Sequence, residues 1–286
     1  MSQKVYEIVT QQIIEKLEEG VIPWKRPFAK RPAVNWVTQK PYRGINTLLL
    51  DGGEYATFNQ IKKHGGRVKK GEKSNLVVFW KLIEIEDEET EEIKKIPLLR
   101  YYRVFEINTQ VEGLESKRKG VSTLDYDPIK AERIIKNYPN PPKIRHVAGR
   151  AYYQPSNDLV NVPDKQEFKK VEDYYSVFFH ELVHSTGHEK RLNRKGITDL
   201  KNNPFGSHLY SKEELVAEIG ASMLCGVAGI VDQTIDNSTT YIKGWLEVLR
   251  NDNRLVVQAS QQAQKACDYI LGKTYDEEPE WGEDRL

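Results

Sequence analysis

The sequence predicts an α+β fold in two domains: a small β-rich domain over residues 1–120 and a mostly helical domain with a short antiparallel sheet over residues 121–286. Three observations lead to this prediction. Prolines and runs of β-branched and aromatic residues dominate the first part. Apolar residues with helical spacing dominate the second part. A stretch rich in Gly, Ser and Lys, with little apolar content, separates the two between residues 112 and 127.

The first expected element is a helix over residues 5–17. Its apolar side chains recur three and four residues apart, and Gly20 and Pro23 follow directly as stop signals. A second helix is expected to begin after Thr57, because Thr57 and Gln60 have the spacing of a capping box. Prolines at positions 23, 27, 32 and 41 exclude a long helix between the two.

A β-hairpin is expected next. Residues 76–86 and 98–108 are rich in β-branched and aromatic residues, and an acidic stretch separates them. In the second domain, residues 127–137 have the pattern of a helix. Short strands are expected at residues 144–148, 151–153 and 159–162, and three or four helices complete the chain.

Composition excludes several classes of protein. No run approaches the roughly 18 to 20 apolar residues of a membrane-spanning helix, so no membrane partner is expected. Residues 1–19 carry four glutamates among their apolar side chains, unlike a secretory signal. Two cysteines are too few for a disulfide framework or a zinc–thiolate cluster. The expected location is the cytoplasm.

The strongest functional signal is the sequence H-E-L-V-H at residues 180–184, within an apolar pattern of helical spacing. On a helix, His180 and His184 project from one face about one turn apart, so both imidazoles can bind one metal ion. Glu181 is offset around the helix and is placed to act as general base on a water at that ion. Arg191 and Arg194 follow; they are expected to anchor the loop, with binding of a substrate carboxylate as the alternative.

A catalytic zinc site takes three protein ligands and keeps one position open, so a third ligand is needed. Glu214, on a helix expected at residues 211–225, is the expected ligand. Glu218 is expected to hydrogen-bond a ligand histidine and is the next candidate ligand, with His188 third. Alternatively, Ser211 and Glu214 form a capping box and Glu214 only caps its own helix. This helix also carries small residues that would let it approach the histidine helix closely: Ala217, Gly220 and Ala221.

The first 80 residues are basic and aromatic, with 14 Lys and Arg against 7 Asp and Glu. Aromatic rings stack on unpaired bases, and lysine and arginine neutralise phosphates, so single-stranded DNA is the expected partner. Alternatively, half or more of the aromatic residues form the core of the small domain, as expected for Phe79, Tyr101 and Phe105. The expected DNA-binding residues are Trp24, Lys25, Arg26, Trp36, Lys40, Tyr42, Arg43, Asn46, Lys69, Lys70 and Lys73.

Two sets of segments resemble ArdC-type antirestriction proteins. The N-terminal single-stranded-DNA-binding domain of that family, also found at the front of some plasmid primases, is similar to the segments GVIPW (20–24), KPYRGIN (40–46), YATFN (55–59) and GGRVKKG (65–71). The zincin metallopeptidase domain of the same family is similar to HELVHSTGH (180–188), RL (191–192) and EELVAE (213–218). The part of the last segment from Glu214 to Glu218 is also similar to the E-x-x-A-D element of other gluzincin-type peptidases, in which the first acid ligates zinc and the last orients a histidine; here Glu218 stands where Asp is usual.

The resemblance implies an antirestriction protein of a mobile element such as a conjugative plasmid, with a DNA-binding domain at 1–120 and a zincin-like domain at 121–286. Its implied cofactor is Zn²⁺, with Mn²⁺ or another divalent metal as the alternative. A protein substrate, such as a host restriction enzyme or another DNA-bound protein, would be hydrolysed at the metal site. The alternative is a non-catalytic protein that coats single-stranded DNA and has a structural or vestigial metal site.

Overall fold

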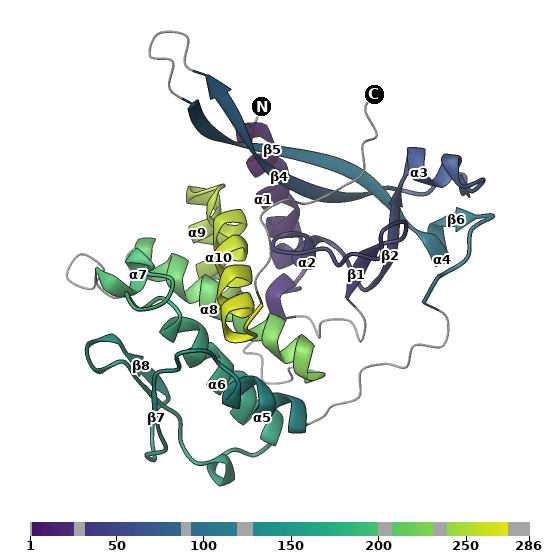
Figure 1. The fold of residues 1–286 in the computed structure, drawn as a ribbon. Helices are drawn as coiled ribbons and strands as arrows, with labels where there is room; N and C mark the ends of the chain where they lie inside the picture. Colours follow the sequence, from purple (N-terminus) through teal and green to yellow (C-terminus); the bar gives the residue numbers. More distant parts are fainter. Residues whose placement is uncertain are drawn as a thin grey trace.

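The computed structural model describes residues 2–25, 32–86, 93–118, 128–199, 208–230 and 239–273. Long helices form most of the C-terminal half, and a long β-hairpin dominates the N-terminal half (Figure 1). The fold is therefore the expected α+β type. The predicted border between residues 120 and 121 lies outside the described residues and stays a prediction.

The N-terminal half begins with the expected helix, α1 (Ser2–Glu18), whose side chains Val5, Val9, Ile13 and Leu17 are buried along one face. The other elements of this half are η1 (Pro23–Lys25), β1 (Ala33–Asn35), α2 (Asn46–Leu49), β2 (Gly53–Thr57), α3 (Phe58–Lys63), β3 (Arg67–Val68), β4 (Asn75–Glu86), β5 (Ile93–Glu106), α4 (Ile107–Gln110) and β6 (Val111–Glu112).

The main sheet has the strand order β1-β2-β5-β4, in which β1 pairs parallel with β2 and the other pairs are antiparallel. The predicted hairpin is confirmed as β4 and β5, with the second strand beginning at Ile93 rather than at Leu98 because it stays in register with β4 as far as Glu86. The predicted capping box is also confirmed, since Thr57 and Gln60 exchange hydrogen bonds at the start of α3.

The C-terminal half contains α5 (Pro128–Lys136), β7 (Lys143–Arg145), β8 (Tyr152–Gln154), η2 (Pro155–Asn157), β9 (Leu159–Asn161), η3 (Lys165–Glu167), α6 (Val171–Ser185), α7 (Lys195–Thr198), α8 (His208–Ala228), α9 (Thr239–Asn251) and α10 (Leu255–Ile270). Figure 1 shows α8, α9 and α10 between α6 and the β4–β5 hairpin. The helices α6 and α10 pack directly on α8, which is the central helix of this half.

The small sheet of this half differs from its prediction. Its strand order is β7-β9-β8, and although β8 and β9 are antiparallel as expected, β7 and β9 are parallel. The chain reverses from β8 into β9 through η2 and Asp158, which has a left-handed φ of 47°. After this tight reversal β9 lies between β7 and β8 and runs in the same direction as β7. The sheet is therefore mixed rather than antiparallel.

One continuous cluster of buried apolar side chains joins the two halves. It includes α1, Trp24 of η1 and Leu76 and Val78 of β4 from the first half, and residues of α6, α8, α9 and α10 from the second. Two smaller clusters lie within the N-terminal sheet region. Polar contacts cross the same boundary: Thr10 donates a hydrogen bond to the Asn253 carbonyl at 2.6 Å, and Arg43 pairs with Asp268. The helix that begins the chain is thus part of the core of the C-terminal helices.

Candidate metal centre

Two helices position the candidate metal ligands. The helix α6 carries His180 and His184 one turn apart, and α8 carries Glu214. These helices approach closely where predicted, because a Cβ atom on Gly220 would lie 2.8 Å from a methyl carbon of Val183. The alternative in which Glu214 caps its helix is wrong, since α8 begins at His208 and Glu214 lies in its interior.

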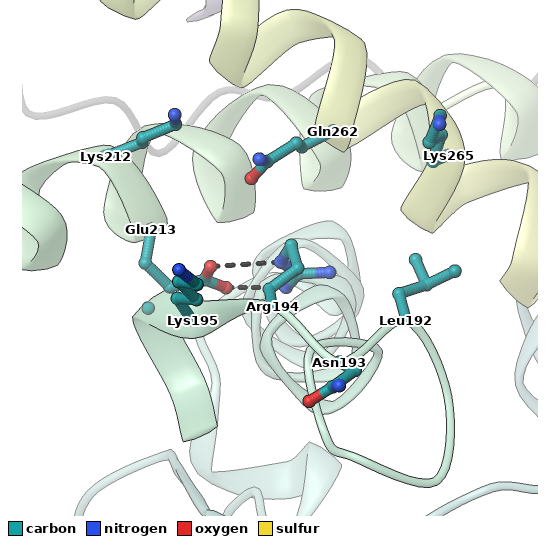
Figure 2. A pocket seen from close by; sticks show the side chains of 9 residues that line it. Leu192, Asn193, Arg194, Lys195, Lys212, Glu213, Gln262 and Lys265 are labelled. Atoms are coloured by element: carbon teal, nitrogen blue, oxygen red, sulfur yellow. Dashed lines mark hydrogen bonds and ion pairs between the residues drawn. The ribbon is translucent and has the colours of Figure 1, made fainter. Parts of the chain in front are cut away.

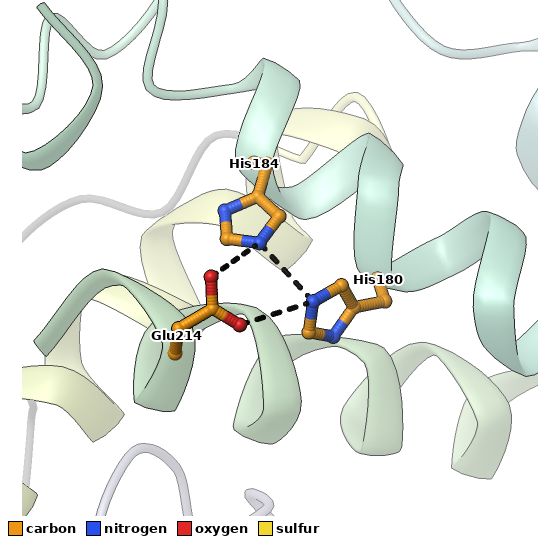
Figure 3. Close-up of side chains that lie close together, drawn as sticks. All are labelled: His180, His184 and Glu214. Carbon is orange, nitrogen blue, oxygen red and sulfur yellow. Dashed lines mark hydrogen bonds and ion pairs between the residues drawn. The ribbon is translucent and has the colours of Figure 1, made fainter. Parts of the chain in front are cut away.

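The side chains of His180, His184 and Glu214 converge on one point (Figure 3). The Nε2 atoms of the two histidines are 3.1 Å apart, and each lies 3.6 Å from a different carboxylate oxygen of Glu214. In a tetrahedral site with bonds of about 2.0 to 2.1 Å, neighbouring ligand atoms are about 3.3 Å apart. The triangle of donor atoms therefore has the size that a zinc-type divalent ion requires.

The chemistry of the three donors also suits a divalent cation. Two imidazoles and one carboxylate form a donor set typical of zinc and of other divalent transition metals. Burial alone would lower the pKa of His180, but the carboxylates of Glu214, Glu181 and Glu218 outweigh burial and raise that pKa to about 9. The carboxylates that stabilise a protonated His180 would stabilise a bound cation by the same attraction.

The other expected residues of this site lie close by. Glu181 follows the first ligand on α6 and is buried, with 9% of its surface exposed. His188 lies beyond the end of α6, where its Nδ1 accepts a hydrogen bond from the Lys190 backbone, and it is not part of the triad that the described residues form.

Sequence reasoning assigned the support of a ligand histidine to Glu218; at His184 the structure places Glu213 in that position instead. The carboxylate of Glu213 lies 3.3 Å from Nδ1 of His184, the ring nitrogen that faces away from the triad. A hydrogen bond from Nδ1–H to this carboxylate selects the tautomer whose Nε2 lone pair is available to a metal. Glu213 was missed because the signal used was spacing on one helix face, and Glu213 lies on a different face from Glu214 and Glu218.

Glu213 is held in turn by Arg194. The guanidinium donates to both carboxylate oxygens, at 3.0 and 2.5 Å, and also to the Val183 carbonyl and the Thr186 hydroxyl. Burial would raise the pKa of the Glu213 carboxyl, but Arg194 and His184 outweigh burial and lower it, so the group stays ionised. Arg191 also anchors its loop as expected, since it pairs with Asp158 and donates to the Ser185 carbonyl.

Glu218 has a different partner, on α9. Its carboxylate lies beside the Tyr241 hydroxyl and raises the pKa of that group, and its charge also raises the pKa of His180. The indole Nε1 of Trp24 donates to the same hydroxyl at 3.2 Å. Trp24 of η1, in the N-terminal half, therefore contacts Tyr241, the neighbour of Glu218.

Several expected DNA contacts are wrong because the structure buries them. Trp24, Trp36 and Tyr42 have less than 10% of their surface exposed, so none of them offers a ring face to a base, and Asn46 is buried to a similar extent. Trp24 packs edge-on against Trp245, and Asn46 exchanges hydrogen bonds with the Val78 backbone. The three aromatic residues therefore belong to the core, as the alternative interpretation predicted. Asn46 joins α2 to β4 through its hydrogen bonds.

The remaining expected contacts are basic residues. Lys40, Lys70 and Lys73 are exposed, Lys69 donates to the Thr109 carbonyl at 2.7 Å, and Arg43 forms its ion pair with Asp268. Lys25 lies in η1, its side chain is outside the described part of the structure, and so is all of Arg26.

A surface on β5 was missed by sequence reasoning. Tyr101, expected in the core, is 42% exposed, and its neighbour Tyr102 is 44% exposed. Arg100 and Arg103 flank the pair and are exposed too. Successive side chains on a strand point to opposite faces of the sheet, so two adjacent tyrosines cannot both face one core. The run Arg-Tyr-Tyr-Arg therefore already indicated that an aromatic side chain lies outside the core.

No helix in the ranges that the structure describes has both the length and the apolar character needed to cross a bilayer.

Two family models match this chain. Residues 3–105 match the family model for the N-terminal domain of the anti-restriction factor ArdC, and residues 130–262 match that for a zincin-like metallopeptidase.

Solved structures and curated relatives agree with these matches. The crystal structure of antirestriction ArdC from the R388 plasmid is similar in its metal-free form, with a TM-score of 0.73, 35% identity and coverage of 93% of this chain and 96% of that chain. Its Mn(II)-bound form is similar with a TM-score of 0.74, 32% identity and coverage of 93% and 97%.

Among curated proteins, y4eC of Sinorhizobium fredii is 32% identical over 95% of this chain and 93% of its own length. A DNA primase TraC of Escherichia coli is 33% identical over 93% of this chain. The chain spans only a fifth of that primase's length.

Proposed function

Because the chain belongs to the ArdC family of antirestriction proteins, we propose that it binds the incoming single-stranded DNA of a mobile element and hydrolyses a protein substrate at the His180–His184–Glu214 centre. The observation that supports hydrolysis is the triangle of donor atoms on α6 and α8, with Glu181 beside it. The proposed metal is Zn²⁺, with Mn²⁺ as the alternative.

The residues of this chain would divide the work. His180, His184 and Glu214 hold the ion through three donors and leave a position open for substrate. A divalent ion at such a site supplies Lewis-acid activation of a carbonyl and lowers the pKa of water. Glu181 accepts the proton from the attacking water and returns it to the leaving amine. Glu213 keeps His184 in the tautomer that binds the ion.

A second candidate function is coating of single-stranded DNA by a protein whose metal site is structural. The favouring observation is that residues around the site, such as Arg194 and Glu213, are buried and packed between helices of the main core. A metal bound there would stabilise the native state, because it binds the folded chain and not the unfolded one.

The substitution Glu181→Gln distinguishes the two functions. At saturating Mn(II) or Zn(II), we expect cleavage of added casein to fall by about 10²- to 10⁴-fold, while binding to an oligo(dT) strand stays unchanged. The exposed Glu189→Gln is the matched control. If casein cleavage survives Glu181→Gln, the proposed mechanism is wrong. If the variant still protects DNA from restriction, the protection comes from coating of the single strand and not from proteolysis.

A further inference from the structure

A cavity of about 480 Å³ lies beside the metal centre, and apart from the Arg194–Glu213 pair its lining has no part in the chemistry proposed above. Its lining residues come from the loop after α6 and from the helices α7, α8 and α10: Leu192, Asn193, Arg194, Lys195, Gly196, Lys212, Glu213, Gln262 and Lys265. Its volume is within the range of small-ligand sites, roughly 300 to 1,000 Å³.

The charge of the lining selects the class of ligand. Four of the nine residues are cationic and one is anionic, and that carboxylate, Glu213, is already paired with Arg194. Three lysines make up the rest of the charged lining: Lys195 of α7, Lys212 of α8 and Lys265 of α10 (Figure 2). Asp252, outside the lining, attracts the charge of Lys212. The lining thus carries more positive than negative side chains, contributed by three elements, and such a lining attracts an anion.

The donor geometry favours phosphate over carboxylate. Planar carboxylates are recognised best by the fork of an arginine, and Arg194 already directs that fork at Glu213. Lysine ammonium groups act as point charges with three donors each, which suits a tetrahedral oxyanion approached from several directions. Lys212 donates one hydrogen bond to the Gln258 amide at 2.5 Å, an interaction that holds its side chain in place.

The neutral part of the lining is polar as well. Asn193 and Gln262 contribute amide groups, and Leu192 is the one large apolar side chain among the lining residues. Figure 2 shows Lys212 on α8 and Gln262 and Lys265 on α10, with the amide of Gln262 directed toward the Arg194–Glu213 pair. An apolar peptide side chain would find little to contact here, whereas a phosphate with attached hydroxyl groups would find both charges and amides.

We propose that this cavity binds a phosphate-bearing anion, held by Lys195, Lys212 and Lys265. The phosphate can come from a free ligand, such as pyrophosphate or a nucleoside triphosphate, or from the backbone of a single strand. The proposal does not depend on peptidase activity.

Calorimetric titration of the full-length, metal-free chain tests the proposal, with pyrophosphate, ATP and an oligo(dT) strand as three separate probes. We expect one site for at least one probe, and a loss of affinity of about tenfold or more in Lys212→Gln and in Lys265→Gln, because each removes a charge-assisted contact. Lys195→Gln, which changes an exposed side chain at the start of α7, is a third variant with little risk to folding. Lys243→Gln, an exposed lysine on α9 outside the cavity, is the matched control and should bind like the unchanged chain.

The outcomes separate the sources of the phosphate. Loss of pyrophosphate or ATP binding in the cavity variants identifies a free phosphate ligand, and loss confined to oligo(dT) identifies the strand backbone. Unchanged Mn(II) affinity in the same variants shows that the neighbouring Arg194–Glu213 pair is still folded. If no probe binds, or if all probes bind the three variants as tightly as the Lys243→Gln control, the proposal is overturned.

Discussion

At the scale of single residues, Glu213 shows how the metal centre is supported. Its carboxylate contacts His184 on one helix and Arg194 on the following loop, so it fixes a ligand and a loop at once. A buried ion pair of this kind is costly to break from one side, because the remaining charge is left without a partner.

The first prediction concerns Glu213→Gln, which keeps the shape of the side chain and removes its charge. We expect metal affinity to fall by about 10- to 100-fold, because Nδ1 of His184 loses its anionic acceptor. The free energy of unfolding should fall by about 3 to 5 kcal/mol, because Arg194 is left buried with an uncompensated charge. Chelator competition and urea unfolding measure the two effects.

The control is Glu189→Gln, an exposed glutamate just after α6. A Glu213→Gln protein that binds Mn(II) as tightly as this control would show that Glu213 does not position His184. The unchanged chain should also lose this part of its stability in acid. The folded-state pKa of Glu213 is lowered, so its contribution is present above the unfolded pKa and disappears as the pH falls through the folded value.

At the scale of elements, β5 is the strand whose role changed most between sequence and structure. It pairs with both β2 and β4, yet Tyr101 and Tyr102 remain exposed beside Arg100 and Arg103. Tyr102 also packs edge-on against Phe79, with ring centroids 6.2 Å apart, and the Arg103 guanidinium lies 5.8 Å from the Tyr101 ring. Rings held in this way lose little entropy on stacking against a base.

We therefore predict that Tyr102→Ala weakens binding to oligo(dT) by about 1 to 3 kcal/mol, or roughly 5- to 150-fold, because one stacking platform is removed. Tyr102→Phe keeps the ring and should bind nearly as well. For Arg103→Gln, the plot of log affinity against log salt should become shallower by about 0.7 if the arginine contacts one phosphate. Unchanged affinity in Tyr102→Ala would exclude β5 as the stacking surface.

At the scale of the whole molecule, the main finding is that both halves share a core. Trp24 is fully buried, packs against Trp245 with ring centroids 5.6 Å apart, and contacts Tyr241, all of which ties η1 to α9. The 3₁₀-helix η1 also packs on α8, the helix that carries Glu214. Stability should therefore be shared between the halves.

The corresponding prediction is that Trp24→Ala lowers the free energy of unfolding by about 3 to 5 kcal/mol and speeds amide hydrogen exchange in α8 and α10. The exposed Tyr152→Ala is the control, and it should change neither quantity by more than a few tenths of a kcal/mol. Faster exchange confined to residues 2–118 would show that the two halves unfold independently.

Local patterns were enough for much of this molecule. The capping box at Thr57, the amphipathic α1, the β4–β5 hairpin and the spacing of His180 and His184 all follow from interactions between residues near in sequence. Such interactions depend on helix and strand periodicity alone, and they indicated both the fold class and the α6 half of the metal centre before any packing was known.

Packing between distant segments decided the rest. Whether Glu213 or Glu218 supports a histidine depends on the rotation of α8 against α6 and on Arg194, which lies between them in sequence. Whether Trp24 meets a base or a core depends on α9, more than 200 residues away. Periodicity specifies which residues share a face of an element, but only the burial of that face against its neighbours determines what each side chain contacts.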